Sequence, residues 1–204
     1  MHLYLTSNSP WDTTYCTESG QVIYKAESRA LLGPRHITIS KVQPARTIDL
    51  DADGKVPEEA LRDAFTELGK VEWHAITYSK IRVGDGEEVS VKDFFRKDGW
   101  DSYGKIGVDG LLGRGRVFTG LDGKEYVWKM DSTKPKLYAF AKKGENETLV
   151  ANFHQQHFGL VGKARPASLE IQPEFNHMAD IIVITLIYIE KLRREKAGQN
   201  SGGD

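Results

Sequence analysis

The stretch that decides the fold is residues 177–197, which read HMADIIVITLIYIEKLRREKA. Its β-branched centre favours a strand by intrinsic propensity, whereas its length and its flanks favour a helix. Asn176 can cap the start, Asp180 lies near the positive end of the helix dipole, and basic residues from Lys191 onward lie near the negative end. The centre is apolar on all sides, as in a helix that is buried all round. We therefore predict a buried C-terminal helix at about residues 177–197.

Most of the remaining chain carries short strand patterns that can wrap this helix. Two probable hairpins stand out, with turns at Gly84-Asp85-Gly86 and at Asp122-Gly123. Their strands are residues 80–83 with 88–92 and residues 116–119 with 125–129. Further strands are expected at residues 3–5, 22–24, 36–42, 71–76, 136–140, 148–153 and 168–171. The sequence thus predicts a mainly antiparallel β protein.

One amphipathic helix is predicted in the first half, at residues 57–68. Pro57 suits the first helical position, Glu58 and Glu59 favour the positive end, and Gly69 favours termination. Four apolar residues fall at helical spacing on one face: Leu61, Ala64, Phe65 and Leu68. A single apolar face indicates a helix on the surface of the protein.

Composition bounds the class of protein. The chain has 204 residues, of which 39% are hydrophobic and 10% aromatic, which is enough apolar material for a core. No linker or repeat divides it, so we expect a single domain over residues 1–197 and a disordered polar tail over residues 198–204. The formal net charge of -1 argues against a nucleic-acid partner, since such domains are usually strongly basic.

The sequence also carries signals of cellular location. Cys16 is the only cysteine, so no disulfide within the chain and no cysteine-based zinc site is expected. No signal peptide is visible at the start of the chain. The longest apolar run, residues 181–189, is far shorter than the roughly 20 residues of a membrane span. We expect a cytoplasmic protein without a transmembrane segment.

Six segments, taken in order, carry a family resemblance. They are EWH (72–74), VKDFFRKDGW (91–100), GRVFTG (115–120), DGKEYVWK (122–129), ASLEI (167–171) and DIIVITLIYIEKLR (180–193). Together they resemble a fungal domain family of unknown function that is expanded in mushroom-forming species. This resemblance covers nearly the whole chain, and it implies no activity because the family has no assigned chemistry.

The layout of the chain also resembles the tubby-like C-terminal superfold, which tubby domains, phospholipid scramblases and LURP-one proteins share. That resemblance implies a closed antiparallel β-barrel around the buried apolar C-terminal helix, plus one surface helix. A closed barrel leaves no unpaired strand edges and gives the apolar helix an enclosed position.

Basic residues recur in the two hairpins and in the glycine-rich segment at residues 99–115. If they gather on one face, they can hold anionic phospholipid headgroups, as the tubby-like resemblance suggests, at about 1 kcal/mol for each cation. Nearby aspartates offer the alternative of an ordinary neutralised surface. Our first hypothesis is a non-catalytic module that binds such headgroups at a membrane surface. The candidate contacts are Arg96, Lys97, Arg114 and Arg116.

A second candidate site lies just before the predicted surface helix. Asp49, Asp51 and Asp53, followed by Gly54, imitate the start of a calcium-binding EF-hand loop. The bidentate glutamate expected at the twelfth position is replaced by Ala60. The alternatives are a weak calcium site and an acidic turn that leads into a capped helix.

Two other function classes stay open. One is a protein–protein interaction or structural domain without a small ligand, and the other is a cryptic enzyme. No Gly-x-Ser-x-Gly elbow occurs, and Cys16 lies in a polar segment without a helix to lower its pKa. We therefore assign no catalytic residue and expect no cofactor.

Overall fold

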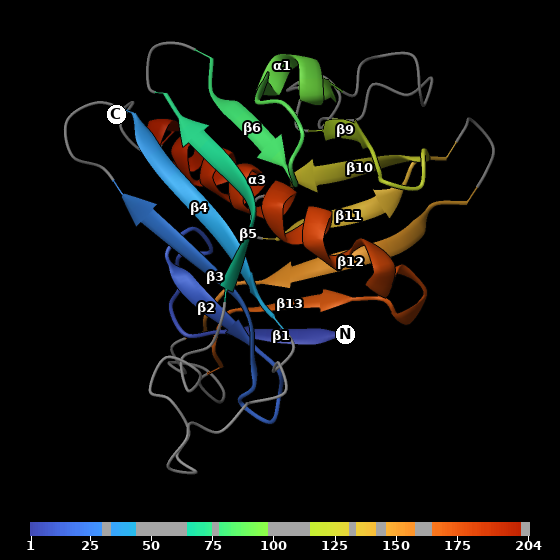
Figure 1. The fold of residues 1–204 in the computed structure, drawn as a ribbon. Helices are drawn as coiled ribbons and strands as arrows, with labels where there is room; N and C mark the ends of the chain where they lie inside the picture. Colours follow the sequence, from blue (N-terminus) through green and yellow to red (C-terminus); the bar gives the residue numbers. More distant parts are fainter. Residues whose placement is uncertain are drawn as a thin grey trace, which may run out of the picture.

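The computed structural model describes residues 1–29, 34–43, 65–74, 78–97, 115–130, 134–141, 146–157 and 165–200. Within them, 13 strands form one antiparallel sheet in the spatial order β7-β6-β5-β4-β3-β2-β1-β13-β12-β11-β10-β9-β8 (Figure 1). The strands are β1 (His2–Leu5), β2 (Thr13–Cys16), β3 (Val22–Arg29), β4 (Arg35–Val42), β5 (Phe65–Trp73), β6 (Lys80–Val83), β7 (Val89–Ser90), β8 (Arg96–Lys97), β9 (Gly115–Thr119), β10 (Glu125–Met130), β11 (Pro135–Ala139), β12 (Thr148–His154) and β13 (Ser168–Ile171).

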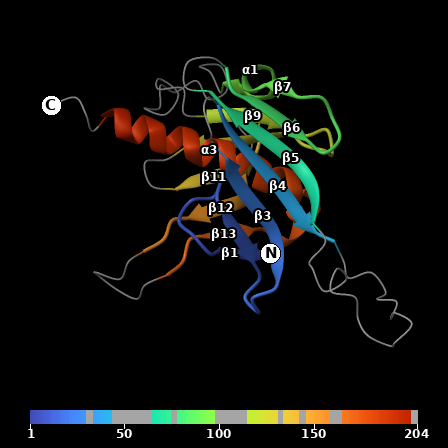
Figure 2. The same ribbon diagram turned by 60° about the vertical axis from the view of Figure 1, so that its left-hand side comes forward.

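The predicted C-terminal helix is confirmed as α3 (Ala179–Asn200), which follows the 3₁₀ helix η2 (Pro173–Met178). Figures 1 and 2 show α3 lying inside the curl of the sheet, with β4 and β5 on one side and β10 and β11 on the other. Every residue from Ile181 to Glu190 is buried. Burial on all sides therefore overrides the strand propensity of the β-branched run. The helix continues to Asn200, three residues past the predicted end.

A buried hydrogen-bond chain fixes α3 against the sheet. Thr185 donates from Oγ1 to the carbonyl oxygen of Ile181 at 2.7 Å and accepts from Nε1 of Trp128 at 3.0 Å. Trp128 is fully buried in β10, so its indole N–H has no access to water and needs this partner. The pair sets the position of the helix along its own axis.

The described strands do not close into a hydrogen-bonded ring, so the closed barrel is not confirmed. The two edges of the sheet are β7 and β8, which the short helix α1 (Val91–Phe94) and Phe95 join along the chain. We call the gap between these two edge strands the seam. Phe95 is 3% exposed and stacks on Tyr188 of α3 at 5.1 Å between ring centroids, and its edge meets Phe118 at 6.0 Å. Aromatic packing therefore fills the seam where no ladder hydrogen bonds run.

The helix predicted at residues 57–68 is wrong at its C-terminal end, and residues 57–64 lie outside the described part of the chain. Residues 65–68 belong to β5, where Phe65 pairs with Val42 and Thr66 with Lys41 of β4. A Cβ at Gly69 would clash with the carbonyl oxygen of Arg82 in β6. Gly69 therefore permits close approach of two strands and does not end a helix.

Most of the predicted strands are confirmed, including the hairpin of β9 and β10. In the other hairpin, strand β7 ends at Ser90, whose side chain caps α1 by accepting from the backbone N–H of Lys92. Strand β2 was not predicted, because residues 13–16 contain threonines and one cysteine and lack an apolar alternation. No helix in the described residues is both long enough and apolar enough to cross a membrane.

Candidate functional site

The candidate site surrounds the end of α3 that leaves the sheet, which points towards the C-terminus in Figure 2. The buried apolar run stops at Ile189, and a buried carboxylate and three cations follow within the next five residues. Strands and the loop between β1 and β2 bring further aromatic and charged side chains to the same level. We call this group the exit collar, made of Trp11, Trp73, Arg116, Tyr188, Glu190, Lys191, Arg193, Arg194 and Glu195.

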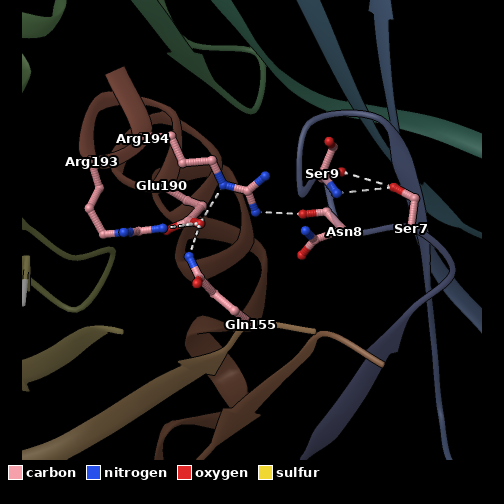
Figure 3. Close-up of polar contacts among 7 residues, drawn as sticks. All are labelled: Ser7, Asn8, Ser9, Gln155, Glu190, Arg193 and Arg194. Atoms are coloured by element: carbon pink, nitrogen blue, oxygen red, sulfur yellow. Dashed lines mark hydrogen bonds and ion pairs between the residues drawn. The ribbon is translucent and has the colours of Figure 1, made fainter. Parts of the chain in front are cut away.

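Glu190 is the centre of one half of the exit collar (Figure 3). Glu190 is 0% exposed, yet its carboxylate accepts hydrogen bonds from three neighbouring side chains. Arg193 donates to both oxygens at 2.7 and 2.9 Å, Arg194 donates from Nε at 2.7 Å, and Gln155 donates from Nε2 at 3.0 Å. A buried carboxylate is tolerated only with such charge-assisted bonds. This half of the collar therefore ties Glu190 to Gln155, the residue after β12, and to the last turns of α3 itself.

Arg194 also connects α3 to the loop between β1 and β2. Its Nη2 donates to the carbonyl oxygen of Asn8 at 2.5 Å (Figure 3). The loop is itself ordered by Ser7, whose Oγ donates to the carbonyl oxygen of Asp12 at 2.7 Å. The Oδ1 atom of Asn8 is buried and has no hydrogen-bond partner among the described residues. The first loop and the last helix are thus joined by one arginine.

Two tryptophans bring aromatic faces to the exit collar. The ammonium of Lys191 lies 4.6 Å from the ring centroid of Trp73 and 5.4 Å from that of Trp11. The guanidinium of Arg194 lies 5.0 Å from the Trp11 ring. Lys191 also pairs with Glu195, with Nζ 3.0 Å from Oε1. These contacts are cation–π interactions, which strengthen as the cation loses water.

Arg116 and Tyr188 form another part of the exit collar. Arg116 pairs in register with Trp128, whose indole bonds to α3, so Arg116 lies on the inner face of β9. It is 8% exposed, and Nη1 donates to the carbonyl oxygen of Gly115 at 2.9 Å. Burial raises the pKa of Tyr188, while the charge of Arg116 and its hydrogen bond to the phenol act in the opposite direction. A cation is therefore held beside a buried hydroxyl.

The predicted headgroup contacts are only partly brought together. Lys97 pairs in register with Arg116, so the two share a face, and Lys97 is exposed. Arg96 pairs with Val117 and faces the opposite side, where it bonds to Glu125 at 2.9 Å. Arg114 lies outside the described residues. The exit collar therefore gains Lys97 as a neighbour of Arg116, and it does not include Arg96.

The other predicted site cannot be placed, because Asp49, Asp51 and Asp53 lie outside the described residues. Within the described ranges, no group of three or more histidine, cysteine or acidic side chains is arranged to hold a metal ion. A polar cluster at the start of α3 is compact: Asp180 accepts from the Tyr24 hydroxyl at 2.6 Å and from the Lys41 ammonium at 2.9 Å. Its ion pair balances its charge, so it offers no excess of either sign.

Sequence reasoning missed most of the exit collar. One signal was available, since Glu190 is followed by arginines three and four positions later, the spacing of ion pairs on a helix. No local pattern marks Trp11 or Gln155, because they reach the collar from distant strands and loops. Their contribution depends on the tertiary fold.

The fold and the exit collar together define a class: a mainly antiparallel β protein built around a buried C-terminal helix whose C-terminal end is surrounded by cations and tryptophans. The chain belongs to the Family of unknown function (DUF6593), whose match covers residues 8–195. No curated protein and no solved structure matches the chain. The site must therefore be interpreted from its own chemistry.

Proposed function

We propose that this protein is a non-catalytic module that binds anionic phospholipid headgroups at the cytoplasmic surface of a membrane. The observation that carries this proposal is the charge of the exit collar. Among the described residues, the collar contains four cations, Arg116, Lys191, Arg193 and Arg194, and two carboxylates, Glu190 and Glu195. Lys97 adds a further exposed cation beside Arg116. This excess of basic side chains among the described residues supports an anionic ligand at this end of α3.

The tryptophans support a membrane as the source of that anion. Indole rings are enriched at the level of lipid headgroups, because one part of the ring is apolar and the N–H is polar. Trp11 is half-buried and lies beside Arg194 and Lys191. A basic side chain near an anionic surface contributes about 1 kcal/mol, so two or three accessible cations give weak, salt-sensitive binding.

We also propose that the fold is related to the tubby-like superfold that the sequence resembles in layout. An antiparallel sheet that encloses an apolar helix near the C-terminus supports a relationship to the tubby-like C-terminal superfold. The open seam between β7 and β8 is a departure from a fully closed barrel. We also propose that the family is the one expanded in mushroom-forming fungi, on the strength of the six sequence segments.

Vesicle co-sedimentation tests the function. The full chain is mixed with vesicles of digalactosyldiacylglycerol, a neutral lipid without a quaternary ammonium, with or without added phosphoinositide, at about 0.1 M and about 1 M salt, where the Debye length is about 10 Å and about 3 Å. We expect binding to the anionic vesicles to exceed binding to the neutral ones and to fall at high salt. Absence of binding to anionic vesicles at low salt would exclude the proposal and favour a protein partner.

Variants locate the binding face. Lys97→Gln combined with Arg114→Gln removes two predicted contacts, and we expect affinity for anionic vesicles to fall by roughly fivefold for each cation that touches lipid. Lys124→Gln is the matched control. Its side chain is 79% exposed in the β9–β10 turn. That turn lies near Met178, at the opposite end of α3. Equal losses in the double variant and in the control would contradict a site at the exit collar.

A further inference from the structure

Two indole rings of the exit collar hold a single ammonium group between them. Nζ of Lys191 lies 4.6 Å from the Trp73 centroid and 5.4 Å from the Trp11 centroid. The carboxylate of Glu195 lies 3.0 Å from the same nitrogen. The Lys191 side chain is only 12% exposed. Two aromatic faces and one carboxylate around a poorly hydrated cation are the components of an aromatic cage.

A lysine ammonium is not the cation that suits this cage best. It carries three N–H donors and is strongly hydrated. Among the described residues, Glu195 is its one hydrogen-bond acceptor. Aromatic faces offer electrostatic attraction but no strong acceptor for the other two donors. A quaternary ammonium has no N–H group to satisfy, and its methyl groups pack against indole faces, which is why such cages recognise choline-type ligands.

We propose that Trp11, Trp73 and Glu195 form a binding site for a quaternary ammonium group of the choline type, and that the Lys191 ammonium occupies this site in the unliganded protein. The ligand displaces that ammonium and takes over its contacts with both rings and with the carboxylate. The site does not depend on the proposed binding of anionic lipid, because its ligand group is a cation and its lining is aromatic.

The surroundings allow this exchange with little rearrangement. Trp73 is 8% exposed and packs against Tyr188 at 5.4 Å, so its ring is fixed by the core. Trp11 also contacts Arg194, whose guanidinium lies 5.0 Å from its ring centroid. Lys191 lies one residue beyond the last fully buried position of α3, and its flexible stem can carry the ammonium outward to water. The cage is thus preorganised, and only one side chain must move.

Choline titration of the full chain tests the site without any lipid. Indole N–H signals are followed by ¹H–¹⁵N correlation spectroscopy at constant ionic strength, with Trp11→Phe and Trp73→Phe used to assign them. We expect saturable shifts of the Trp11 and Trp73 signals and an unchanged Trp128 signal, because that indole is bonded to Thr185 in the core. Lys191→Ala removes the internal competitor and is expected to bind choline at least about tenfold more tightly, given the strength of cation–π contacts.

Two controls define the chemistry. The neutral isostere 3,3-dimethyl-1-butanol has the shape of choline without its charge, and we expect it to bind at least about tenfold more weakly. Lys25→Ala removes a half-exposed lysine that pairs with Glu27 on β3, and it should leave choline affinity unchanged.

The proposal is overturned if Lys191→Ala, folded by circular dichroism, gives no saturable shift, or if the isostere binds as well as choline. Failure of choline binding would leave the vesicle experiment, and the function it tests, unaffected.

Discussion

Lys97 of β8 and Arg116 of β9 stand directly opposite each other in register, so their side chains share one face of the sheet. Arg96, the immediate neighbour of Lys97, faces the other side and forms an ion pair with Glu125. Residues that are adjacent in the sequence therefore belong to different surfaces. This relationship separates the predicted basic contacts into one that borders the exit collar and one that does not.

The first prediction follows from that separation. Lys97→Gln should reduce binding to anionic vesicles by roughly fivefold, because it removes an exposed cation at the exit collar. Arg96→Gln removes the same charge from the opposite face and should change binding by less than about twofold. Vesicle co-sedimentation at low salt measures both. A larger effect of Arg96→Gln would place the membrane contact on the outer face of the sheet.

The second prediction concerns the buried carboxylate. Glu190→Gln keeps the shape of the side chain but leaves Arg193 and Arg194 without their anion, next to the core. We expect the free energy of unfolding to fall by about 3 kcal/mol, the low end for breaking a buried ion pair, because the Arg194 side chain is 27% exposed and stays partly hydrated. Urea denaturation measures the change. Glu195→Gln is the control: this exposed carboxylate should contribute within about 0.5 kcal/mol.

The third prediction tests the bond between Trp128 and Thr185. Thr185→Val preserves shape but removes the acceptor for a buried indole N–H, which should cost about 1–3 kcal/mol of unfolding free energy. In a Trp128→Phe background the same substitution should cost about 1 kcal/mol less, since no N–H is left unsatisfied. A double-mutant cycle by chemical denaturation gives this coupling. A coupling near zero would show that the bond does not position α3.

The fourth prediction is a loss of stability at alkaline pH. Burial and a hydrogen bond to Asp122 raise the pKa of Tyr126 to about 12. Burial also raises the pKa of Tyr15 and, together with Asp180, that of Tyr24. Above pH 10, the ordinary pKa of tyrosine, the unfolded chain loses protons that the folded chain retains. The free energy of unfolding should therefore fall as the pH rises from about 10 to about 12.

Denaturant midpoints measured across that pH range test the sign of the effect, and absorbance of phenolate reports the titration itself. Tyr78 is 59% exposed and its pKa is lowered by Lys92, so it should ionise before the buried tyrosines. Tyr126→Phe should flatten the pH dependence. A midpoint that does not change between pH 9 and pH 11 would contradict the prediction.

The sequence was sufficient for the elements whose pattern is long or repeated. Residues 177–197 predicted a buried helix because nine consecutive positions are nearly all apolar and charges flank them, and α3 has that burial. The β9–β10 hairpin followed from alternation around Asp122-Gly123, and Gly123 has the positive φ of 77° that such a turn requires. The predicted helix at 57–68 extended too far because four apolar residues fit helical spacing, while pairing with β4 decides the outcome for residues 65–68.

The site was less accessible to sequence reasoning for a physical reason. Arg96, Lys97 and Arg116 were grouped by proximity in the chain, but the two-residue strand β8 was not predicted, and without it the faces of these side chains cannot be assigned. Arg116 is buried beside Tyr188 because of register, which depends on the partner strand. The cage of Trp11 and Trp73 joins β5, α3 and the first loop, and only the tertiary fold brings them together.

The seam has a consequence for how the chain is divided. Starting at β8, the sheet follows the chain to β13, passes to β1 by pairing, and follows the chain again to β7. Each half is a meander, and α1 with Phe95 is the covalent joint between them. A single cut in α1 would therefore leave two fragments that share the β1–β13 ladder, while α3 from the second fragment still packs against β5 of the first. Such fragments should reassociate when expressed separately. The strands follow a circular order in which the sheet is interrupted between β7 and β8, whereas the chain is interrupted between β13 and β1.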